Sequence, residues 1–214
     1  MAGPWDARLA RWLVAPLRGT PVTPNHLTTL RLVTGLGAAA AFWCGTYRWS
    51  NVAAALLVIS NILAHADGEF ARLTGASSRW GHIYDLASDA VVTTLLFIAI
   101  GAGVETWPPY LSGLPPMLLG VVAGSTIAYI FYVRMRIEAL AGKAATQQAS
   151  AAGFETEDIL YLIPLITWAH GLVALLVAAS LFAPLYAIWV IVEYRRVLKS
   201  LGTGIAQRSS GALQ

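Results

Sequence analysis

The sequence predicts an all-α integral membrane protein with six transmembrane helices behind one short interfacial helix. Hydrophobic residues make up 57% of the 214 residues and charged residues only 12%, and the mean hydropathy is +0.63. Soluble domains carry about twice that share of charges. Apolar runs of about twenty residues, the length that crosses a hydrocarbon core, recur along the chain. The alternating ten-residue segments of a membrane β-barrel do not occur.

The first segment, residues 4–17, predicts a short helix that lies in the membrane interface. One helical face would carry the apolar side chains of Trp5, Leu9, Trp12 and Leu13. Arg8 and Arg11 flank this face, as in helices that rest on headgroups. A cleavable signal peptide is disfavoured, because the apolar stretch is short and basic.

Six apolar segments follow, and we expect each to span the membrane: residues 25–45, 51–72, 82–103, 115–134, 157–169 and 172–197. The fifth segment is short, and His170 and Gly171 form the best turn signal before the sixth. Residues 1–201 would thus form a single membrane domain. The Gly/Ser-rich tail, residues 202–214, is expected to be disordered.

The positions of Lys and Arg predict the orientation of the chain. Six spans place both termini on one side, and twelve basic residues fall there: Arg8, Arg11, Arg18, Arg72, Arg79, Arg134, Arg136, Lys143, Arg195, Arg196, Lys199 and Arg208. Arg48 alone falls on the other side. Because short cytoplasmic segments are enriched in Lys and Arg, we expect both termini to be cytoplasmic.

Three aspartates gather where the second and third spans meet. Asp67 lies near the cytoplasmic end of the second span, and Asp85 and Asp89 lie in the first turns of the third. Residues four apart share a helix face, so Asp85 and Asp89 repel unless a cation joins them. Carboxylates suit hard divalent cations, and a two-metal site could also hold a phosphate. Structural acids are the alternative, but ionisable groups inside a membrane usually mark a functional site.

Two glycines and an arginine lie beside these aspartates. Gly68 and Gly81 weaken their helices, so each predicts the close approach of a ligand or a neighbouring helix. Arg72 can reach the same cavity from the end of the second span, and an arginine beside metal ions suits a diphosphate.

This arrangement resembles the signature of the CDP-alcohol phosphotransferases, D-x2-D-G-x2-A-R-x8-G-x3-D-x3-D. Seven of its eight fixed positions match with every spacing kept: Asp67, Gly68, Ala71, Arg72, Gly81, Asp85 and Asp89. The segment TPNHLTTLRL, residues 23–32, is also similar to the start of the family's first helix. The resemblance covers most of the chain and fits the family's architecture of six spans behind an interfacial helix.

The resemblance implies transfer of a substituted phosphate from a CDP-linked donor, commonly CDP-diacylglycerol, to an alcohol, with release of CMP. Asp67, Asp85 and Asp89 would hold divalent cations, Mg²⁺ or Mn²⁺ and two in an intact site, and Asp89 would be the general base. Gly68, Ala71 and Gly81 would line the nucleotide pocket, and Arg72 would contact phosphate. The enzyme would serve phospholipid synthesis, with its site on the cytoplasmic face of a bacterial inner membrane. Nothing points to nucleic acid.

The sequence departs from the signature at its first aspartate, where it has Ala64. In the family this carboxylate is a metal ligand, so the site lacks one charge and up to two oxygens. Three explanations stay open: an inactivated variant of an active enzyme, a natural enzyme with fewer ligands or one metal, and a natural pseudoenzyme.

Other residues give weaker indications. Asn25 and Arg31 could contact phosphate or nucleotide, although helix capping also explains this segment, and Arg134 could attract an anionic acceptor or simply follow the positive-inside bias. Gly120 and Gly124 form a GxxxG motif that suits packing within the chain or a homodimer, and the resemblance favours the dimer.

Two other functions remain: a catalytically silent CDP-lipid or metal-binding membrane protein, and a small cation-coupled transporter, which lacks the expected paired broken helices. The acceptor alcohol is not readable.

Overall fold

In the computed structural model the described residues, 5–76, 78–104, 106–141 and 160–211, form seven α-helices and no strand. The helices are α1 (Trp5–Val14), α2 (Pro24–Trp43), α3 (Tyr47–Thr74), α4 (Arg79–Ala102), α5 (Pro116–Ala141), α6 (Ile163–Trp168) and α7 (Leu172–Gly211). Short 3-10 turns cover Ala15–Leu17 and Pro109–Leu111. The prediction of an all-α protein is therefore confirmed for these ranges.

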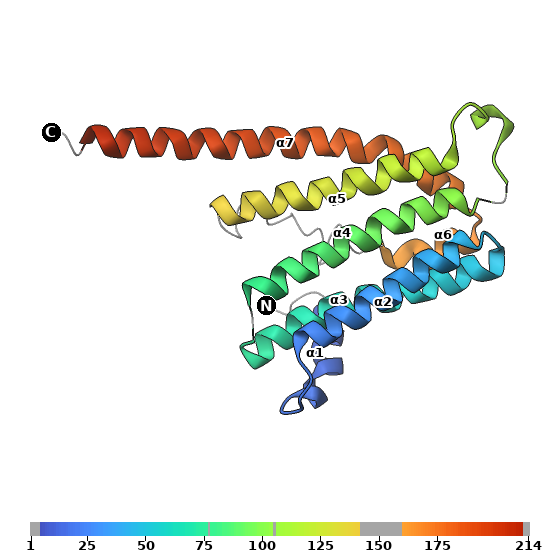
Figure 1. Ribbon diagram of the computed structural model, residues 1–214, viewed down its shortest axis with the longest axis horizontal. Helices are drawn as coiled ribbons and strands as arrows, with labels where there is room; N and C mark the ends of the chain where they lie inside the picture. The colour runs from blue at the N-terminus through green and yellow to red at the C-terminus, as the bar shows by residue number, and fades with distance from the viewer. Residues whose placement is uncertain (1–4, 77, 105, 142–159, 212–214) are drawn as a thin grey trace.

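Four helices are long and apolar enough to cross a membrane: α3, Trp80–Ala102 of α4, α5, and Leu172–Lys199 of α7. They correspond to the second, third, fourth and sixth predicted spans, so the chain is an integral membrane protein. The 20-residue α2 runs alongside α3 and α4 (Figure 1). It falls outside the four because Asn25, His26 and Arg31 make its first half polar.

One predicted segment differs from the structure. The fifth span was expected over residues 157–169, but its first three residues lie outside the described ranges, and α6 has only 6 residues. Such a helix is too short to span a bilayer alone. The α7 helix is described as far as Gly211, and the disorder of residues 202–214 stays a prediction. Residues 1–4, Lys143 and residues 212–214 lie outside the description.

Local capping sets the ends of the helices that meet at the aspartates. The backbone N–H of Thr23, the residue before α2, donates to His26 Nδ1 at 3.1 Å. The α3 helix ends at Gly75, whose φ of 66° favours glycine. Ser78 caps α4 by accepting the backbone N–H of Gly81 at 2.9 Å. The caps at Gly75 and Ser78 end α3 and begin α4 within a few residues of each other.

The GxxxG motif of α5 packs within the chain. A Cβ on Gly120 would lie 2.3 Å from the Phe97 carbonyl oxygen, and one on Gly124 would lie 2.8 Å from the Thr94 carbonyl oxygen. Both neighbours belong to the backbone of α4, so only glycine allows α4 and α5 to approach this closely. Of the two uses that the sequence left open for this motif, the structure shows packing within the chain.

The α1 helix lies against the site end of α3. Its Ala10 and Val14 are buried in a cluster with Ala66 and Phe70 of α3. Trp12 faces outward with 72% of its surface exposed. One buried face and one exposed aromatic face fit a helix at a membrane interface.

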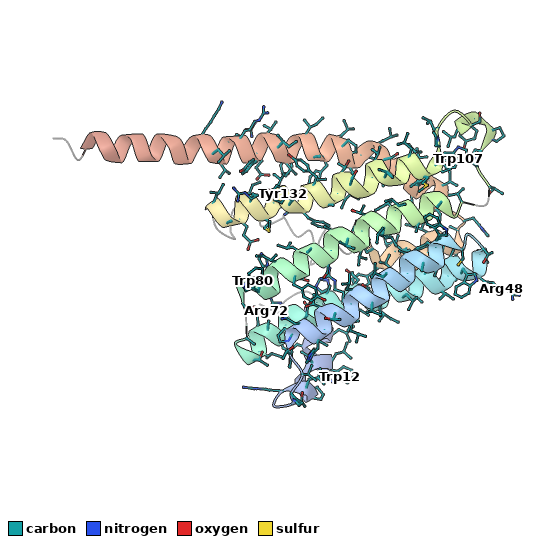
Figure 2. All side chains as sticks on the ribbon, viewed as in Figure 1. Trp12, Arg48, Arg72, Trp80, Trp107 and Tyr132 are labelled. Atoms are coloured by element: carbon teal, nitrogen blue, oxygen red, sulfur yellow. The ribbon has the colours of Figure 1, made fainter. Side chains whose placement is uncertain are left out.

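The helix ends divide the molecule into two poles. The α1 helix, the α3–α4 turn and the end of α7 lie at one pole, and the α2–α3 turn and α6 lie at the other (Figure 1). Figure 2 shows Trp12, Arg72 and Trp80 near the first pole and Arg48 with Trp107 at the opposite pole. This arrangement agrees with the predicted separation of Arg48 from the other basic residues.

Candidate functional site

A cavity of about 360 Å³ opens where the first turns of α2, the last turns of α3 and the first turns of α4 meet. Seven residues singled out from the sequence line it: Asn25, Asp67, Gly68, Ala71, Arg72, Gly81 and Asp85. Glu138 of α5 also contributes to the wall. Three consecutive helices thus bring most of the predicted site residues to one place.

Asp67 is held by α2. Only 5% of its surface is exposed, and the Thr28 hydroxyl donates to Asp67 Oδ2 at 2.8 Å. A buried carboxylate needs such a partner, because burying it without one costs several kcal/mol. Thr28 therefore fixes one carboxylate oxygen of Asp67 at the wall of the cavity.

Arg31 lies between the two aspartates of α4. Its Nη1 pairs with Asp85 Oδ1 and its Nη2 pairs with Asp89 Oδ1. The Arg31 side chain is buried, and its carbonyl oxygen accepts the Ser60 hydroxyl at 2.9 Å. The guanidinium joins the two carboxylates whose repulsion the sequence predicts. The phosphate contact that the sequence offered for Arg31 stays a prediction, and its guanidinium is directed here to these two carboxylates.

Asp89 faces a second, smaller cavity. This space of about 30 Å³ is also lined by Arg31, Ser60 and Asn61, and is large enough for one water molecule. The Asn61 Nδ2 atom is buried and has no hydrogen-bond partner in the described part of the chain. Asp89 lies one helical turn after Asp85 on α4, and Arg31 pairs with both residues.

The carboxylates have the right chemistry for a divalent cation, although Arg31 occupies two of them. Within the described ranges, no three His, Cys, Asp or Glu side chains are close enough to hold a metal ion. Asp67 and Asp85 nevertheless line the same cavity, and carboxylate oxygens are the ligands that Mg²⁺ and Mn²⁺ prefer. The donor set thus fits a hard cation.

Ala64 lies on the same face of α3 as Asp67, three residues before it. An aspartate there would add a second carboxylate to the side of α3 that faces the site. Arg134, which could attract an anionic acceptor or follow the positive-inside bias, is not among the residues that line the described cavity. Glu138, one helical turn further along α5, lines the cavity instead. The sequence indicated this residue only by its position four residues after Arg134.

Arg72 is paired with a residue that the sequence analysis missed. Its Nη2 donates to Glu69 Oε1 at 2.7 Å. The other oxygen of Glu69 accepts both Nε and Nη2 of Arg11, at 3.1 and 3.0 Å. Glu69 occupies a variable position of the signature, three residues before Arg72, and that spacing could have indicated the pair.

The two predicted glycines differ in their surroundings. A Cβ on Gly81 would lie 3.2 Å from Asn25 Oδ1, so this glycine allows α4 to approach α2 closely. A Cβ on Gly68 would meet only Arg72 Nη2, at 3.7 Å. Gly81 therefore has a packing role at the cavity mouth, whereas Gly68 leaves the arginine uncovered.

The family model for CDP-alcohol phosphatidyltransferases matches residues 21–194. This match covers most of the chain and includes α2, α3, α4, the cavity and the aspartates. The chain therefore belongs to the CDP-alcohol phosphatidyltransferase family, whose enzymes act in phospholipid synthesis. A comparison with curated proteins found no match.

Proposed function

We propose that this protein transfers a phosphatidyl group from CDP-diacylglycerol to an alcohol and releases CMP. Two facts support the proposal together: the family match, and the cavity that gathers Asp67, Gly68, Arg72, Gly81 and Asp85. Of these, the cavity carries the argument, because it gathers carboxylates, small residues and an arginine from three helices.

In this proposal the wall around Gly68, Ala71 and Gly81 accepts the cytidine diphosphate. Small side chains leave room for the nucleotide, and Arg72 offers the donors of its exposed guanidinium to the phosphates. Asn25 lies beside Gly81 and could hydrogen-bond the same headgroup. The diacylglycerol chains would remain in the bilayer.

The proposed reaction needs a base for the acceptor alcohol. The hydroxyl oxygen attacks the phosphorus next to diacylglycerol, a new P–O bond forms, and the bond to the CMP oxygen breaks. Asp89 takes the hydroxyl proton. Arg31 supports this role by holding one Asp89 oxygen, which leaves the other free to accept.

Asp67, Asp85 and Asp89 would hold Mg²⁺ or Mn²⁺, in keeping with a family that is generally dependent on divalent metals. The ion would offset negative charge on the diphosphate and the leaving CMP. Asp67 and Asp85 already line the cavity.

Ala64 weakens this site, so we propose that the chain as given turns over slowly. The specific observation is that Arg31 pairs with both Asp85 and Asp89. With one carboxylate fewer, a cation competes less well with this arginine. The same observation favours a second candidate function, a catalytically silent protein that binds a CDP-lipid without transferring it.

The remaining parts of the proposal concern the surroundings. Six spans, with α2 and the segment around α6 added to the four apolar helices, would place both termini and the cavity on the cytoplasmic side, in a bacterial inner membrane. A homodimer remains part of the proposal on the family resemblance alone. Arg134 would act near the acceptor only if it turns toward the cavity.

The test is CMP release by the purified protein from CDP-diacylglycerol, with Mg²⁺ or Mn²⁺ and a panel of alcohols. CMP release that depends on one alcohol, with formation of its phosphatidyl ester, would support the enzyme and identify the acceptor. CDP binding without release would favour the silent protein. Neither binding nor release would refute both.

A further inference from the structure

Glu69 is a buried carboxylate within the signature segment, and the reaction has no direct use for it. Only 4% of its surface is exposed. Burying one charge is unfavourable unless partners compensate it. Glu69 has two, since Arg72 binds Oε1 and Arg11 binds Oε2. One buried acid between two arginines leaves the group with a net positive charge.

The free side of Arg72 faces the proposed diphosphate site. Its side chain is 59% exposed, and it lines the cavity together with Gly68 and Asp67. Only Nη2 is used for Glu69, so further N–H groups of the planar fork remain for an anion. Because Nη2 is already bound to Glu69, the guanidinium loses little conformational freedom when a phosphate binds.

The other partner comes from the interfacial helix. Arg11 lies between Ala10 and Val14 of α1, which are buried against Ala66 and Phe70 of α3. The apolar contact and the Arg11–Glu69 pair therefore join α1 to the same turns of α3 that carry Asp67 and Arg72. A helix that rests on the membrane is in this way connected to the wall of the cavity.

We propose that Glu69 is a positioning residue that holds Arg72 ready for the diphosphate of the donor and ties that arginine to α1 through Arg11. The inference rests on the proposed function, because it presumes a nucleoside diphosphate in the cavity. It adds that the interfacial helix contributes to donor affinity through one buried carboxylate.

The test measures CDP binding to the detergent-solubilised protein in Mg²⁺, with Glu69→Gln, Arg72→Ala and the double variant. We expect each single variant to raise the Kd for CDP about tenfold, the effect of about one charge-assisted hydrogen bond. Because Glu69 acts through Arg72, the double variant should bind no more weakly than Arg72→Ala alone. Additive losses, or an unchanged Kd in Glu69→Gln, would overturn the inference.

A pair of variants in α1 provides the matched control. Arg11→Met and Arg8→Met remove the same charge from the same helix, but Arg8 is exposed and only Arg11 contacts Glu69. We expect a Kd about threefold higher for Arg11→Met, as for the loss of a partly exposed ion pair, and no change for Arg8→Met. Equal effects would contradict the proposal. This comparison decides the question even if Glu69→Gln fails to fold.

The outcomes separate this inference from the proposed function. If the parent protein binds no CDP, the proposed function fails and the role of Glu69 fails with it. If the parent binds CDP and Glu69→Gln binds it equally well, the function stands and only the positioning role is lost.

Discussion

Replacing Arg31 is the most informative change at the site, because its guanidinium pairs with two carboxylates, those of Asp85 and Asp89. Its side chain is 5% exposed, whereas those of Asp85 and Asp89 are 34% and 33% exposed. Removing one partner of a buried pair costs about 3–5 kcal/mol. Water reaches about a third of each aspartate, so we reduce the expected loss for Arg31→Met to about 2 kcal/mol.

That loss should appear as a fall in Tm of about 4–8 °C, given about 2–4 °C per kcal/mol for a chain of this size. Without the arginine, Asp85 and Asp89 gain affinity for a divalent cation. Mg²⁺ at about ten times its Kd would then return about 1.4 kcal/mol. The assay is thermal unfolding in detergent, with and without Mg²⁺.

Arg48→Met is the control, because Arg48 is exposed at the opposite pole of the molecule (Figure 2). It should change Tm little and should not alter the response to Mg²⁺. The reasoning would be refuted if Arg31→Met were no less stable than Arg48→Met, or if Mg²⁺ stabilised the variant no more than the parent.

Three further variants test the packing and the cavity. Gly120→Ala should destabilise the protein by about 1–3 kcal/mol in thermal unfolding, because its Cβ meets the backbone of α4, whereas Gly113→Ala, with nothing within 4 Å, should not. Thr28→Val should cost about 1–3 kcal/mol by leaving Asp67 without its buried donor, and Thr28→Ser should restore stability; equal Tm values for both would count against this hydrogen bond. Gly81→Ala should weaken CDP binding severalfold in titrations, since its Cβ crowds the amide of the cavity wall, and an unchanged Kd would place the nucleotide elsewhere.

The helices and site residues that could be predicted are those whose positions depend on the sequence nearby. Long apolar runs fix the positions of α3, α4, α5 and α7, because the bilayer sets their length. The signature spacing brings Asp67 and Asp85 to one cavity, since a short turn joins the helices that carry them.

The interactions that could not be predicted join helices distant in sequence. Arg31 looks like a phosphate ligand along α2, and only the approach of α4 turns it into the partner of Asp85 and Asp89. Glu69 looks like a solvated position between signature residues until α1 covers it. Hydrophobic periodicity carries no information on such pairs, because it describes each helix by itself.

The most direct test of the account compares CMP release from CDP-diacylglycerol by the parent protein and by Ala64→Asp, with Mg²⁺ or Mn²⁺ and the alcohol panel. The account predicts that Ala64→Asp is faster by at least about 100-fold, since even the outer partners of a metal site change activity about 10–100-fold. Asp89→Asn in the Ala64→Asp background should abolish the gain. Equal CMP release by the parent and Ala64→Asp, or a gain that survives Asp89→Asn, would contradict the claim that this cavity is a phosphatidyltransferase site lacking one carboxylate.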